Sequence, residues 1–123
     1  MPLSPRLPRR LAVASLFAAA IARPAHAHAI LEESLPPEGG SAPAGMVAIH
    51  LRYNSRIDRA RSRLILIRPD RTQTDLPIVP SGSPDQLSTS AVLATGAYTL
   101  RWHVLATDGH LTRGDLRFAV TEP

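Results

Sequence analysis

The chain has 123 residues, no cysteine, and 14 basic against 10 acidic side chains. All the basic residues are arginines, and four of them precede residue 28, so the segment 28–123 carries equal numbers of basic and acidic side chains. The lack of cysteine excludes thiolate metal sites and thiol catalysis, and the balanced charge gives no support for nucleic-acid binding.

Residues 1–27 have the pattern of a secretory signal peptide. A positively charged start that includes Arg9 and Arg10 is followed by an apolar run over 11–22, and Ala25-His26-Ala27 is a small-x-small cleavage site. General secretion is favoured over twin-arginine export, because the residues around the arginine pair do not complete that signal. We therefore expect a protein that is exported across the cytoplasmic membrane.

Cleavage after Ala27 makes His28 the first residue of a single mature domain, 28–123. Cleavage after Ala29 is the alternative, because Ala27-His28-Ala29 has the same small-x-small form. It would leave Ile30 first and remove the histidine.

Apolar residues alternate with polar ones between clusters of proline and glycine, which is typical of short antiparallel strands. A first edge strand is predicted over 29–34 and a Pro- and Gly-rich turn over 35–40. The next strand spans 47–53, with its apolar residues in one row. The continuous apolar centre of 62–68 predicts a strand that is covered on both faces.

Residues 77–90 are predicted to form a loop with one short strand around Leu87. The clearest strand spans 96–106, and a last strand places Leu116, Phe118 and Val120 on one face. Six or seven strands in fewer than a hundred residues predict an all-β domain, an immunoglobulin-like Greek-key sandwich of about seven strands.

Candidate metal ligands lie at the mature start and in the motif Asp108-Gly109-His110. The free α-amine and the imidazole of His28 can chelate a metal together. On extended backbone, Asp108 and His110 would point to the same face, and Gly109 favours a tight turn between them. Three nitrogen donors and one carboxylate suit Cu(II) better than any other common metal ion.

The other prominent residues are assigned structural roles. Trp102 alternates with apolar residues and is expected in the core, whereas His50 and His103 are expected on the outward faces of their strands. A series of arginines is interpreted as a solvated face, with a docking patch as the alternative and Asp58 as its only nearby acid: Arg52, Arg56, Arg59, Arg61 and Arg63.

Two motifs lie at opposite ends of the mature chain. They are His28-Ala29-x-Leu31-x-x-Ser34-x-Pro36-x-x-Gly39, and Trp102 followed by Asp108-Gly109-His110, Gly114, Phe118 and Val120. In combination they resemble the CopC family of periplasmic copper-binding proteins.

The resemblance implies a small exported β-sandwich that binds one Cu(II) per chain. His28 would supply its amine and imidazole, and Asp108 and His110 match the remaining ligand positions. The resemblance implies binding and delivery of copper, not catalysis. We expect a monomer that serves copper buffering, delivery or resistance and passes Cu(II) to an inner-membrane copper transporter or to a cuproprotein. Two features depart from the family: a methionine-rich stretch is missing, and Tyr53-Asn54-Ser55 replaces an aromatic-Ser-Glu segment, so that acid is absent.

Two other functions fit parts of the pattern. Copper monooxygenases also hold their metal with a mature N-terminal histidine, but the carboxylate of Asp108 would fill the coordination position that such enzymes keep open. A metal-free interaction module is the second alternative, and copper titration of the mature protein distinguishes it.

Overall fold

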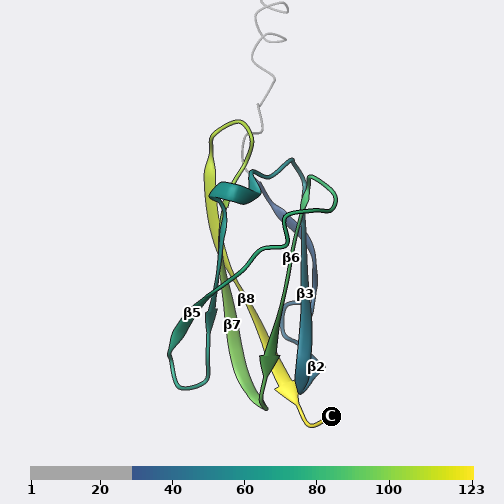
Figure 1. Ribbon diagram of the computed structural model, residues 1–123. Coiled ribbons are helices and arrows are strands. Elements are labelled where there is room, and N and C mark those ends of the chain that lie inside the picture. Colours follow the sequence, from purple (N-terminus) through teal and green to yellow (C-terminus); the bar gives the residue numbers. More distant parts are fainter. Residues whose placement is uncertain (1–28) are drawn as a thin grey trace, which may run out of the picture.

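A computed structural model describes residues 29–123 of the chain (Figure 1). The predicted signal peptide and His28 lie outside the described residues. Within them the chain forms a short 3-10 turn, η1 (Arg59–Arg61), and eight strands: β1 (Leu31–Leu35), β2 (Gly40–Pro43), β3 (Gly45–Tyr53), β4 (Arg63–Ile67), β5 (Gln73–Leu76), β6 (Gln86–Leu93), β7 (Gly96–Leu105) and β8 (Leu111–Thr121). No helix in 29–123 is long and apolar enough to span a membrane.

The strands form two sheets, one with the order β1-β3-β6 and one with the order β2-β8-β7-β4-β5. All neighbouring strands are antiparallel except β2 and β8, which run parallel. The predicted all-β sandwich is therefore confirmed, with eight strands where about seven were expected.

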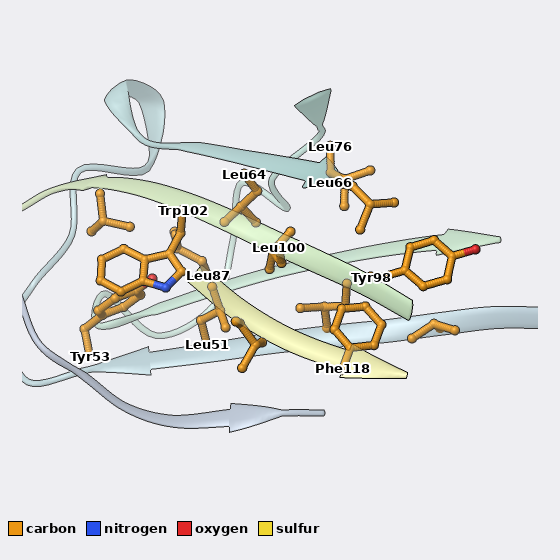
Figure 2. Close-up of a cluster of buried hydrophobic side chains, with 14 of the residues drawn as sticks. Leu51, Tyr53, Leu64, Leu66, Leu76, Leu87, Tyr98, Leu100, Trp102 and Phe118 are labelled. Atoms are coloured by element: carbon orange, nitrogen blue, oxygen red, sulfur yellow. The ribbon is translucent and has the colours of Figure 1, made fainter. Parts of the chain in front are cut away.

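The core lies between the two sheets, where the alternating apolar rows of the long strands meet. In β3 the buried residues are Val47, Ile49, Leu51 and Tyr53, as the alternation predicts. Strands β7 and β8 contribute the opposite wall, and Figure 2 shows Trp102, Leu100, Tyr98 and Phe118 packed against residues of β3, β4 and β6. Trp102 is a core residue, as predicted.

The centre of β4 is buried on both sides of its sheet, as its continuous apolar run predicts. Leu64 and Leu66 belong to the core between the sheets, whereas Ile65 faces the other way and is still buried. In the sheet register Ile65 lies between Arg101 of β7 and Asp75 of β5.

Three strands differ from the sequence-based prediction. Strand β2 consists of Gly-Ser-Ala-Pro and β5 of Gln-Thr-Asp-Leu, so neither has the β-branched and aromatic composition that marks a strand. Strand β6 has eight residues, whereas only a short segment around Leu87 was predicted. Thr89 and Ala91 face the core of the sandwich, and these polar and small side chains weaken the apolar alternation in the sequence.

Candidate metal centre

Asp108 and His110 lie in the hairpin loop that connects β7 to β8. The Gly109 N–H donates to the Ala106 carbonyl at 2.9 Å, and the Ala106 N–H donates to the His110 carbonyl at 2.9 Å. Gly109 has a φ of +95°, a conformation that costs glycine little and other residues more. This is the pattern of a three-residue hairpin loop with glycine in its left-handed position.

The loop brings the two side chains together. The Nδ1 atom of His110 lies 3.3 Å from Oδ1 of Asp108, and the same oxygen accepts the His110 backbone N–H at 3.2 Å. Strand alternation was expected to align this pair. The tight turn at Gly109 does so instead, because the backbone between the ligands is not extended.

The pair is open to solvent and the carboxylate is ionised at neutral pH. The side chains are 45% (Asp108) and 54% (His110) exposed. The backbone N–H of His110, followed by its imidazole, lowers the pKa of Asp108 below its usual value. An accessible carboxylate beside an imidazole provides one oxygen and one nitrogen donor for a metal ion.

The loop is attached to the segment that follows β3. The Thr107 N–H donates to the Arg56 carbonyl at 3.1 Å, and the Asp58 N–H donates to the Leu105 carbonyl at 2.8 Å. Between these bonds, Ile57 and Ala106 form an isolated antiparallel bridge. The segment 54–58 therefore holds the β7 side of the hairpin loop, residues 105–107, at one end of the sandwich.

The same segment holds the start of the described chain. Asn54 accepts the Ile30 N–H through its Oδ1 atom at 2.8 Å and donates its own N–H to the Ile30 carbonyl at 3.0 Å. Ala29 is fully buried in the core. The described chain accordingly begins at the end that carries the β7–β8 loop (top of Figure 1).

The candidate ligand His28 precedes this anchored start and lies outside the described residues. Among residues 29–123, no group of three or more histidine, cysteine or acidic side chains is arranged to hold a metal ion. Asp108 and His110 are thus the described members of the predicted site. Asn54 was not predicted to contribute, and its only signal in the sequence is its place directly after the strand that ends at Tyr53.

The other two histidines of residues 29–123 lie on outward faces, as expected. His50 is exposed on β3, where its Nδ1 atom is 2.9 Å from the hydroxyl of Ser88. His103 lies on the outer face of β7, between Arg63 and Arg113 in the sheet register. Partial burial, followed by the charges of Arg113, Arg63 and Arg101, lowers the pKa of His103, while Asp115 acts in the opposite direction.

This environment predicts a pH effect on folding. Because the folded-state pKa of His103 is below its unfolded value, the unfolded chain takes up the proton first and the copper-free protein loses stability as pH falls below about 6.5. We expect His103→Gln to remove this contribution, so that the melting temperature decreases less between about pH 7 and about pH 5 than in the parent protein. Equal pH dependence in both proteins would contradict the assignment.

The arginine series is more fully paired than the sequence indicated. Asp58 was expected to be its only nearby acid, but Arg52 pairs with Glu32 at 2.8 Å and with Glu33 at 3.2 Å, and Arg63 pairs with Asp75 at 2.9 Å. The expectation was wrong because these partners lie on neighbouring strands, 12 to 20 positions away in sequence. The pairing agrees with a solvated face.

Comparison with known proteins identifies the family to which this chain belongs. The chain is 28% identical over 115 residues to Protein YobA of Escherichia coli (strain K12), covering 90% of this chain and 93% of that protein. The structure of CopC from Methylosinus trichosporium OB3b aligns with a TM-score of 0.71 and 22% identity, over 77% of this chain and 95% of that one. PcoC, described as a copper resistance protein from Escherichia coli, aligns with a TM-score of 0.63 and 19% identity, over 75% of this chain and 99% of that one. Residues 31–121 match the family model of the CopC domain, and the chain therefore belongs to the CopC family.

Proposed function

We propose that this protein binds one Cu(II) ion in the periplasm, through the N-terminal amine and imidazole of His28 together with Asp108 and His110. The observation that carries the proposal is the juxtaposition of Asp108 and His110 at the end of the sandwich where the described chain begins. The function that we propose is copper buffering, delivery or resistance.

The spacing of the two described donors supports a metal site. Two ligand atoms at adjacent corners of a square, each about 2 Å from the metal, are about 3 Å apart. The 3.3 Å between Asp108 Oδ1 and His110 Nδ1 is close to this value. An amine and a second imidazole at the remaining corners would complete a tetragonal set, which Cu(II) prefers.

The donor chemistry favours Cu(II) over Cu(I). Cu(I) prefers soft sulfur ligands, and Met46 is the only sulfur-containing residue in 29–123. It lies near the start of β3, seven residues from Tyr53, which corresponds to about 23 Å along a strand. This distance separates the thioether from the metal-binding end.

Family membership supports the same reading. CopC-family proteins bind copper in resistance and are not enzymes, which agrees with the expected absence of catalysis. A tetragonal set of four protein ligands also leaves no equatorial position for a substrate.

We further propose that the protein acts as a monomer and that the recipient is a copper transporter of the inner membrane.

The proposal is tested on protein exported from the full-length gene, after intact-mass measurement confirms that the chain starts at His28. Copper is titrated while the fluorescence of Trp102, the only tryptophan, is recorded. We expect saturation at one Cu(II) per chain, weaker binding of Zn(II) and of Cu(I) held with a reductant, and weaker Cu(II) binding from neutral pH to about pH 4, because protons compete for the nitrogen ligands.

Three results would contradict the proposal. A mature chain that starts at Ile30 lacks the proposed ligand. Cu(I) affinity equal to that of Cu(II) would indicate a different donor set. Cu(II) binding that does not change in acid would show that nitrogen atoms do not hold the metal.

A further inference from the structure

Asn54 joins the start of the described chain to the segment that holds the metal loop. Its Oδ1 atom and its backbone N–H bond both polar groups of Ile30, at 2.8 and 3.0 Å. Ile30 is 57% exposed, so packing contributes little to its position. The two hydrogen bonds and the burial of Ala29 hold this part of the backbone.

The segment that begins at Asn54 is equally well fixed to the hairpin loop. Two positions after Asn54, the Arg56 carbonyl accepts the Thr107 N–H, and Ile57 then pairs with Ala106. Ala106 in turn accepts and donates the hydrogen bonds that close the loop around Gly109. A short continuous path of backbone bonds therefore runs from Ile30 through Asn54 to the loop that carries Asp108 and His110.

We propose that Asn54 is a positioning residue for the N-terminal metal ligand, an inference that rests on the proposed function. His28 is two residues before Ile30, so at most about 7 Å of chain separates the anchored backbone from the ligand. Anchoring Ile30 reduces the conformational freedom that the N-terminal arm loses when the metal binds. Without the side-chain hydrogen bond the arm is less restrained before binding, so it loses more conformational entropy when the metal binds.

The direct test is Asn54→Ala, which removes the Oδ1 acceptor and leaves the backbone bond in place. We expect Cu(II) affinity to fall roughly tenfold, the size of effect usual for residues that support metal ligands. The electron paramagnetic resonance spectrum of bound Cu(II) should show altered nitrogen coordination. Asn54→Asp keeps an acceptor at the same position and should stay within about threefold of the parent affinity.

A matched control is available at the other end of the sandwich. Asp70 accepts the Thr72 N–H at 3.0 Å through Oδ1, also in an exposed turn. This turn follows β4, whose last residue pairs with Thr99 near the start of β7, far from the loop after Leu105. Asp70→Ala should leave Cu(II) affinity and the spectrum unchanged, while the copper-free melting temperatures of both alanine variants stay similar.

Combination with His28→Ala separates positioning from a general structural effect. With the imidazole gone, the arm delivers the amine alone, so the losses from Asn54→Ala and His28→Ala should be less than additive. Fully additive losses, or unchanged affinity in Asn54→Ala while His28→Ala is defective, would overturn the inference and leave the proposed function intact. If His28→Ala itself binds Cu(II) normally, the proposed function fails first.

Discussion

His28→Ala and His110→Ala are each expected to weaken Cu(II) binding by more than about a hundredfold. Substitution of residues that only support metal ligands typically costs about 10–100-fold in affinity, and loss of a ligand atom should exceed this range. Each variant leaves a Cu(II) ion with one nitrogen fewer than its preferred tetragonal set. Competition with a chelator of known affinity measures the effect.

His103→Ala is the matched control, because His103 lies on an outward face of β7 between two arginines in the register. It should bind Cu(II) with nearly the parent affinity. Asp108→Asn should have an intermediate effect, since the amide retains an oxygen donor but loses the negative charge that attracts the metal ion. Similar losses in His103→Ala and His110→Ala would show that the ligand histidines are assigned incorrectly.

The strands that the sequence predicts best are those whose alternation is set by burial. In β3 and β7 every second residue is apolar and buried between the sheets, so the pattern alone defines both the element and its inward face. Strands β2 and β5 could not be found this way. They are held at sheet edges by backbone pairing with β8 and β4, and backbone pairing leaves no apolar pattern in a short polar segment.

Local sequence patterns also predict only part of the candidate site. Asp108 and His110 are two residues apart, so a local motif identifies them, and the structure shows that a turn brings them together. Asn54 and Ile30 are 24 positions apart, and their contact depends on the antiparallel pairing of β1 with β3. No local pattern in the sequence encodes that pairing, so the role of Asn54 emerges only from the structure.

The structure explains why the sequence motif has a glycine at position 114. The sequence places it four residues after His110, with no indication of why a glycine is needed there. In the structure Gly114 lies directly opposite Trp102 in the β7–β8 register. A Cβ atom at this position would come within 2.7 Å of Cε2 of the indole ring and closer still to Cζ2.

The indole ring has little freedom to move away. Trp102 is 7% exposed, and its ring packs edge-on against Tyr53, with centroids 5.3 Å apart and planes at 73° (Figure 2). Tyr53 itself is buried at the end of β3, next to the segment that begins with Asn54. A shift of the indole would therefore disturb the packing beneath the metal-binding end.

Gly114→Ala should for this reason destabilise the copper-free protein by about 3 kcal/mol, the upper part of the usual range for overpacking a core. For a domain of this size the melting temperature would fall by about 10–20 °C, which thermal unfolding followed by circular dichroism measures. Trp102→Phe tests whether contact with the indole ring causes this loss of stability, because a smaller ring leaves room for the added methyl group. In the Trp102→Phe background the Gly114→Ala substitution should cost much less, a coupling that independent sites do not show. Equal costs in both backgrounds would mean that contact with the indole is not what requires glycine at this position.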